Sequence, residues 1–120
     1  MGPEYQKREK ARSSTKVVEA IVNSGDTASS VADLNGFSVA GLVIPEIDSG
    51  DVTFRVCDTE DGTFLALKDK GGVDIAISAG TGNFAVSDSA ILNALSPWRY
   101  VRIKAATQSA ERKFKFVVKA

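Results

Sequence analysis

The sequence predicts an all-β protein, an antiparallel β-sandwich of jelly-roll-like type with about eight strands, one short helix and an extended N-terminal arm. Three observations lead to this prediction. Apolar or alternating runs recur at roughly eight- to twelve-residue spacing, with turn residues between them. Two complementary runs meet at a polar break within 37–57, and the last two runs alternate strictly, as antiparallel strands do. The length of 120 residues fits one domain, which we place at 15–120.

The central pair of runs differs in pattern. Residues 37–44 are apolar at nearly every position, which predicts a strand covered on both faces. Residues 52–57 alternate between apolar and polar, which predicts a half-buried strand. Its inward side would carry Val52, Phe54 and Val56. Pro45 and the polar stretch 48–51 end the first strand and allow the turn into the second.

The neighbouring strands follow from the same patterns. Val17–Val22 predicts a first strand that ends at the turn 23–26, and a small, polar stretch at 27–36 follows it. Downstream we expect three strands separated by turns that contain glycine. They are Thr63–Lys68, Val73–Ser78 and Asn83–Val86. In the second of these, Val73, Ile75 and Ile77 would share one face.

A short helix is expected at Ser87–Leu95, capped by Ser87 or Asp88. Its apolar side would consist of Ile91, Leu92 and Leu95. Ser96-Pro97 ends the helix because a residue before proline avoids helical geometry. We expect the helix to cover an open end of the sandwich.

Two long strands complete the domain, at Trp98–Ala105 and Arg112–Lys119. The residues expected to face the core are Val101, Ile103, Phe114, Phe116 and Val118. The residues expected to face solvent are Tyr100, Arg102, Lys104, Lys113, Lys115 and Lys119.

Residues 1–14 form a separate charged arm. The side chains available to a partner are Tyr5, Lys7, Arg8, Lys10 and Arg12. A helix here would have no apolar face to bury, so we expect a flexible arm in the isolated chain. No apolar core follows the basic start, and no run is long enough to cross a bilayer, so we expect neither a signal peptide nor membrane insertion.

Composition argues against most catalytic and metal sites. The absence of histidine excludes Ser-His-Asp, Cys-His and His-based zinc sites. The single cysteine, Cys57, excludes an internal disulfide and has no basic neighbour in sequence to activate it. The glycines at 80–82 lack the helix and lysine of a phosphate loop. Acidic turns at 48–51 and 58–61 offer oxygens to calcium, yet they lack an EF-hand ligand set. We therefore predict no enzymatic activity, no cofactor and no metal.

The formal net charge of zero conceals a segregation of charge. Residues 1–16 have five basic and two acidic side chains, a net charge of +3. Residues 17–97 have three basic and twelve acidic side chains, or −9, and residues 98–120 have seven basic and one acidic, or +6. Complementary regions favour association between molecules, although a solvated surface with clustered signs gives the same pattern.

Five short motifs occur in an order that resembles small virion proteins of tailed bacteriophages and prophages. They are Asp33-Leu34-Asn35-Gly36, Gly41–Pro45, Val52–Val56, Asp61–Phe64 and Pro97–Ile103. Each motif alone is a pattern that many strands and turns share, so the resemblance depends on the order of the motifs over residues 20–119. The charged arm and the basic last strand depart from the pattern and leave the mode of attachment open.

The resemblance implies a non-enzymatic virion component that is assembled in the host cytoplasm. A capsid decoration or head accessory protein comes first, and a tail, collar or fibre position is the next alternative. Its partners would be the major capsid protein or another virion protein, and copies of itself, for instance in a trimer. The arm would order on binding as its bases pair with acidic groups of the partner.

Two further classes stay open, ranked below a virion protein. A carbohydrate-binding module would use Trp98 and Tyr100 as an exposed stacking platform for a glycan, such as one on the host surface. A nucleic-acid binder would use the arm and the last two strands, including Arg102, but the acidic middle region would repel phosphate. The structural alternative is that Trp98 caps the sandwich end and the bases are a solvated face.

Overall fold

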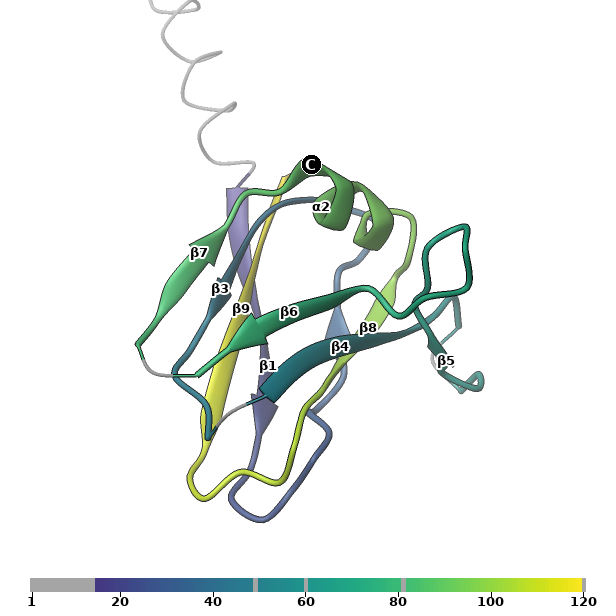
Figure 1. Cartoon of the computed structure of the whole chain (residues 1–120). Helices are drawn as coiled ribbons and strands as arrows, with labels where there is room; N and C mark the ends of the chain where they lie inside the picture. Colours follow the sequence, from purple (N-terminus) through teal and green to yellow (C-terminus); the bar gives the residue numbers. More distant parts are fainter. Residues whose placement is uncertain (1–14, 49, 60, 81, 120) are drawn as a thin grey trace, which may run out of the picture.

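The computed structural model describes residues 15–48, 50–59, 61–80 and 82–119, which form two packed β-sheets with one short helix at an end (Figure 1). The predicted antiparallel β-sandwich is confirmed. The described ranges contain nine strands, and four of them have only two to four residues. The predicted arm at 1–14 lies outside these ranges.

The strands are divided between a sheet A, in the order β1-β9-β3-β7, and a sheet B, in the order β2-β8-β4-β5 with β6 also paired to β4. Sheet A consists of β1 (Thr15–Val22), β9 (Arg112–Lys119), β3 (Ser38–Ile44) and β7 (Phe84–Val86). Sheet B consists of β2 (Ala32–Asp33), β8 (Tyr100–Lys104), β4 (Gly50–Cys57), β5 (Leu65–Ala66) and β6 (Ala76–Ala79). All pairs are antiparallel. The chain crosses between the sheets at each step from β1 to β4 and at each step from β6 to β9, which is the jelly-roll arrangement.

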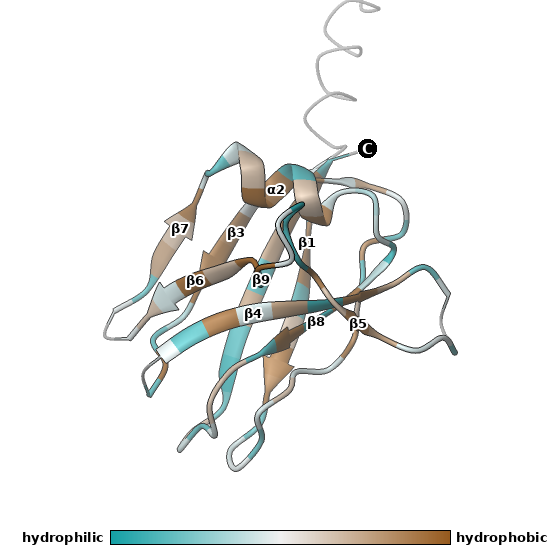
Figure 2. Ribbon diagram, turned by 45° about the vertical axis from the view of Figure 1, so that its right-hand side comes forward, coloured by the Kyte–Doolittle hydropathy of each residue, from teal (hydrophilic) through white to brown (hydrophobic). Residues whose placement is uncertain are grey.

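Alternation along the strands builds one core between the two sheets. The core residues predicted on the last two strands are all fully buried: Val101, Ile103, Phe114, Phe116 and Val118. The lysines that alternate with them on β9 point outward and are exposed, and Figure 2 shows hydrophilic positions along this strand between hydrophobic ones. Burial of each such apolar side chain contributes about 1.5–3 kcal/mol, so the alternating pattern is what drives the two sheets together.

Strand β3 differs from the prediction for 37–44, which expected cover on both faces. Its buried residues alternate with exposed or half-buried ones on either side of Ala40 and Gly41, and the register against β9 shifts between Val39 and Gly41. This β-bulge changes the phase of the strand, so that Val39, Leu42 and Ile44 all point into the core. A continuous apolar run therefore belongs here to a half-covered strand with a bulge.

Two further strands differ in their boundaries from the prediction, and one strand was not expected. The strand expected at 63–68 is reduced to β5, and the one expected at 73–78 begins later, as β6. Val73 does not share a buried face with Ile77, because it lies in the hairpin before β6 and is 62% exposed. The two-residue strand β2 was not predicted, since so short a segment has no periodicity to detect.

The predicted helix is present as α2 (Ser89–Leu95), and the Asp88 carboxylate caps it by accepting a hydrogen bond from the Ala90 N–H at 2.9 Å. Leu92 and Leu95 are buried, and α2 packs on β3 at one end of the sandwich, as predicted (Figure 1). Ser96, which follows it, accepts a hydrogen bond from the Val39 N–H at 3.0 Å and so ties the helix end to sheet A. No helix in the described ranges has the length and apolar character needed to span a bilayer.

Candidate interaction surfaces

The eight residues predicted to contact a partner fall into two groups. Tyr5, Lys7, Arg8, Lys10 and Arg12 belong to the arm and lie outside the described residues. Of the other three, Trp98 lies just before β8, Tyr100 begins this strand and Arg102 is in its middle. The structure does not bring these three together on one exposed surface.

Tyr100 is only 7% exposed, so the prediction that it faces solvent is wrong. It lies on the outer side of sheet B, opposite Cys57 of β4, and neither residue belongs to the core between the sheets. The Arg99 guanidinium stacks 5.1 Å from the centre of the Tyr100 ring. Cys57 is covered by the turn after β4, because a Cβ added at Gly62 would lie 2.5 Å from the Cys57 sulfur. A small outer cluster therefore replaces the expected solvent-facing tyrosine.

The same turn continues over the outer face of sheet B. The Arg102 guanidinium stacks on the Phe64 ring, with 5.2 Å between its carbon and the ring centre. Its Nε is buried and donates no hydrogen bond within the described ranges. Arg102 is thus held against the protein's own turn, which limits its use as a free contact for phosphate.

Trp98 is half-buried and packs against the core. The Trp98 backbone N–H donates to the Leu95 carbonyl oxygen at 3.1 Å, which keeps this residue beside the end of α2. This placement fits the structural alternative, a cap on the sandwich end. Trp98 and Tyr100 do not form the exposed pair that a sugar-stacking platform requires.

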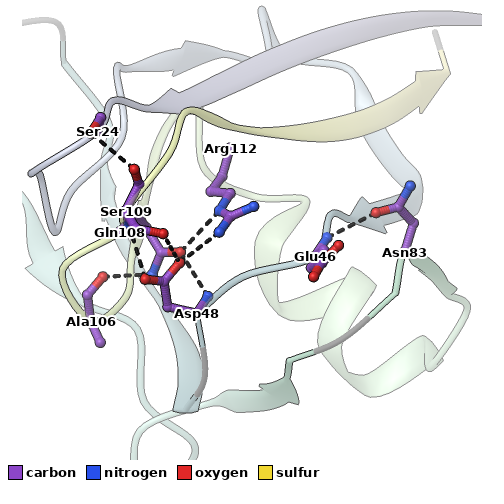
Figure 3. Close-up of polar contacts among 8 residues, drawn as sticks. All are labelled: Ser24, Glu46, Asp48, Asn83, Ala106, Gln108, Ser109 and Arg112. Atoms are coloured by element: carbon purple, nitrogen blue, oxygen red, sulfur yellow. Dashed lines mark hydrogen bonds and ion pairs between the residues drawn. The ribbon is translucent and has the colours of Figure 1, made fainter.

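The acidic turns do not gather into a metal site in the part of the chain that the structure describes, where no three His, Cys, Asp or Glu side chains come together. At the 48–51 turn, Asp48 is instead the centre of a clasp between loops (Figure 3). Its carboxylate accepts hydrogen bonds from the Ser109 N–H and hydroxyl, both at 3.0 Å, and from Arg112 at 2.6 Å. These bonds, that of Arg112 first, lower the pKa of Asp48 below its usual value of 3.8.

Gln108 completes the clasp and is 1% exposed, a rare position for a polar side chain. Its carbonyl oxygen accepts from the Asp48 N–H at 3.0 Å and from Arg112 at 3.2 Å, and its amide donates to the Ala106 carbonyl at 2.7 Å (Figure 3). Because the buried amide is satisfied on both sides, this network is structural. It joins the start of β9 to the connection from β3 to β4.

A second ion pair lies toward the other end of the sandwich. The Asp33 carboxylate accepts two hydrogen bonds from Arg99, at 3.0 and 3.3 Å, and one from the Asn35 N–H at 2.9 Å. The bond from Arg99 is the main cause of the lowered pKa of Asp33. Both side chains are about half exposed, so the pair adds little to stability.

The outer face of sheet A has no covering turn in the described ranges and carries a row of lysines. Lys113, Lys115 and Lys119 point outward from β9, which lies between β1 and β3. Lysines commonly protect the edges of sheets, whereas these occupy the interior of one. Glu19, opposite Lys115, is the acidic residue among the outward positions of β1. The face therefore has a positive centre.

A shallow hollow of about 400 Å³ opens beside this face, where β3 ends and β9 begins. It is lined by Val43, Pro45, Glu46, Asn83, Glu111, Arg112, Lys113 and Lys115. Arg112 is engaged by Asp48, and Lys113 lies 3.9 Å from Glu111. The mixture of signs and the open shape make the hollow a part of the surface rather than a catalytic cleft.

The charge segregation seen in the sequence corresponds to a division between strands and loops. Among described residues, eight of eleven basic side chains lie in strands. They are Lys16, Arg55, Arg102, Lys104, Arg112, Lys113, Lys115 and Lys119. Nine of the twelve acidic side chains lie in loops, and the exceptions are Glu19, Asp33 and Asp51. The sheets are thus basic and the connections acidic.

Comparison with known proteins assigns no family. No protein-family model and no curated protein matches the chain. Eight chains of solved structures match, and one is the SPBc2 prophage-derived protein YomS, with 12% identity, a TM-score of 0.48, and coverage of 88% of this chain and 95% of that one. Another is a mutant GH29 fucosidase from Ruminococcus gnavus in complex with fucose, with 14% identity, a TM-score of 0.41, and coverage of 83% of this chain and 19% of that one. At these identities and TM-scores the likenesses carry no functional argument.

Proposed function

We propose that this chain is a non-enzymatic structural protein of a bacteriophage virion, which binds the capsid as a decoration or head accessory protein. The observation that carries the proposal is the uncovered outer face of sheet A, with three lysines on an interior strand. The ordered motifs described above support the same class. The jelly roll, an architecture used by viral capsid domains, supports it by analogy only.

The partner that fits this face is a protein surface with acidic groups, in the first instance the major capsid protein. Each exposed lysine–carboxylate pair contributes about 0.2–1 kcal/mol, so a few such pairs alone would bind weakly. A capsid repeats its binding site many times, and the four bases of the arm at 1–14 would add a second, linked contact. Weak contacts combined in this way suit a protein that attaches after the shell has formed. A position in the tail, collar or fibre is the alternative.

Particles of the phage or prophage whose genome encodes the chain provide the direct test. We expect mass spectrometry to find the chain in head particles banded in a density gradient, at a fixed ratio to the major capsid protein. Recovery with separated tails would favour the alternative position. Recovery in the soluble fraction alone would refute the proposal.

Two matched double variants test the face itself. Lys113→Ser with Lys115→Ser should lower occupancy on particles prepared without the native protein, and added salt should lower it further. Lys68→Ser with Lys70→Ser removes the same charge from a hairpin and should leave occupancy unchanged. Equal occupancy for both variants would exclude the lysine row as the contact. Replacement of the four arm bases by Ser tests the arm in the same assay.

A further inference from the structure

Strand β1 is the long edge strand of the sandwich. It has eight residues, contains neither Pro nor Gly, and pairs with β9 without a register shift. The other edge strands of the described fold, β2, β5, β6 and β7, have only two to four residues. Proteins protect exposed edges with short strands, bulges, proline or charge, and β1 lacks the first three.

The hydrogen bonds of Ile21 show which residues of β1 face the free edge. The Ile21 N–H donates to the Ser30 hydroxyl at 3.1 Å, and its carbonyl accepts from the Ser30 N–H at 2.9 Å. Both backbone groups of one residue in a strand point to the same side, and every second residue repeats that direction. Thr15, Val17 and Glu19 therefore point their N–H and C=O groups away from β9. Within the described ranges these groups have no backbone partner.

The side chains at this edge suit strand addition. Val17 is 54% exposed, and Thr15 and Glu19 flank it on the outer face. Glu19 forms no ion pair among the described residues, although Lys115 lies opposite it on β9. A further strand at this edge could pair with the free backbone donors and acceptors and cover the exposed valine.

We propose that a second copy of this chain pairs with this edge, β1 against β1, antiparallel about a two-fold axis at Val17. Ser30 blocks the edge from residue 21 onward, which leaves three outward residues on each copy. One antiparallel register pairs all three of them: Val17 with Val17 of the second copy, and Thr15 with Glu19 in both directions. Each of these pairs exchanges two N–H···O bonds.

Charge complementarity favours a second copy over an unrelated peptide. In this register four side chains lie next to one another across the outer face of the joined sheet. They are Lys119 and Thr15 of one copy, followed by Glu19 and Lys115 of the second copy. Each Glu19 carboxylate thus lies between lysines of both copies, and the short threonine between them leaves room for the Lys119 side chain. Because of the two-fold axis, the same set of four side chains occurs twice in the joined sheet.

The dimer is expected to be weak, because three residue pairs bury less area than a standard stable interface. It does not depend on attachment to a capsid, since its hydrogen bonds come from the edge strand β1, and Lys115 and Lys119 only lie beside Glu19. The purified full chain is therefore sufficient for the test, and failure of the dimer would leave the capsid proposal standing.

Sedimentation velocity of the full chain over a wide concentration range is the first experiment. We expect a monomer at low concentration and a dimer at high concentration, and a Kd raised at least tenfold in Val17→Lys. The matched control is Val73→Lys, which changes another exposed valine in a hairpin away from β1 and should keep the wild-type Kd. Thermal melts establish that both variants are folded. A wild-type monomer at every concentration, or a wild-type Kd in Val17→Lys, would overturn the proposal.

Cross-linking tests the register. With a short bismaleimide, Val17→Cys should cross-link to itself, whereas the native chain with buried Cys57 should not. Thr15→Cys and Glu19→Cys should cross-link only when the two variants are mixed, because residue 15 of one copy lies opposite residue 19 of the other. The two copies of residue 15 are four residues apart along the strand, a distance of roughly 13 Å. Cross-linking of Thr15→Cys alone with the same yield as the mixture would contradict the two-fold register.

Discussion

The outer surfaces of the two sheets differ in what covers them. On sheet B the turn after β4 folds back over Cys57, Phe64 stacks under Arg102, and Tyr100 is buried although it points away from the core. On sheet A the lysines of β9 and the free edge of β1 have no such cover in the described ranges. The protein covers part of one outer face with its own chain and leaves the other open, and this open face is the one that we propose binds partners.

This difference predicts different consequences for substitutions on the two faces. Changes on the outer face of sheet B should affect stability, because they remove packed contacts. Changes on the outer face of sheet A should affect binding and leave stability nearly intact. The four predictions below start from the largest expected effect.

Tyr100→Ala should lower the free energy of unfolding by about 3–5 kcal/mol, as truncation of a buried aromatic side chain does. Tyr100→Phe retains the ring and should cost much less. Val117→Ala truncates a half-buried residue on the outer face of sheet A and should cost about 1 kcal/mol or less. Urea denaturation measures the free energy of unfolding of all three variants. Equal decreases for Tyr100→Ala and Val117→Ala would contradict the difference between the two outer faces.

Gly62→Ala should destabilise the protein by about 1–3 kcal/mol, the usual cost of forcing an extra methyl group into a packed site. The new Cβ would lie 2.5 Å from the Cys57 sulfur and nearer still to the Thr59 hydroxyl, so the turn must move off sheet B. Gly80→Ala is the control, because no atom lies within 4 Å of a Cβ at that position. A neutral Gly62→Ala would show that the turn is not packed against the sheet.

The clasp at Asp48 should make stability depend on acid. The pKa of Asp48 is lower in the folded chain than its usual value of 3.8. The carboxylate therefore adds to the free energy of unfolding at pH values above 3.8, and this contribution is lost as the pH falls through the lowered pKa. Denaturation at pH 5 and pH 2.5 should therefore show a smaller decrease for Asp48→Asn than for the native chain. Asp33→Asn serves as the comparison at the other end of the sandwich, where the lowered pKa predicts the same sign. An identical decrease in Asp48→Asn and the native chain would mean that the clasp does not form in solution.

The smallest effect on stability is expected for the lysine row. Lys113→Ser with Lys115→Ser should change the free energy of unfolding by no more than about 0.5 kcal/mol, as exposed substitutions do. The urea midpoint checks this value in the same preparation that is used for particle binding. A large loss of stability would assign the lysines to the fold and would remove the stability contrast between the two faces.

Much of the fold could be predicted from local patterns. The strict alternation on β9 correctly assigned Phe114, Phe116 and Val118 to the core, and the Asp88 cap and the Ser96-Pro97 stop correctly bounded α2. These signals are reliable because capping and alternation depend on neighbours within a few residues. The bulge in β3 escaped prediction because an added residue changes the phase of the strand without leaving a mark in an apolar run.

The candidate surfaces were predicted less well, for a related reason. Alternation with the buried Val101 predicts that Tyr100 faces solvent. In the structure Arg99 stacks on the Tyr100 ring, and the turn after β4 covers the neighbouring Cys57. The Asp48 clasp joins residues about sixty positions apart in sequence. The acidic 48–51 turn indicated a site of interest there without indicating its partners.

The sequence by itself determined the fold class, most strand positions, the helix and the separation of charge, because these follow from side-chain periodicity and composition. Tertiary structure alone decided which strand became an unprotected edge, which outer face the chain covered and which acid met Arg112. Each of these outcomes depends on contacts between segments far apart in the chain, and the free energy of such contacts is not expressed in any local pattern.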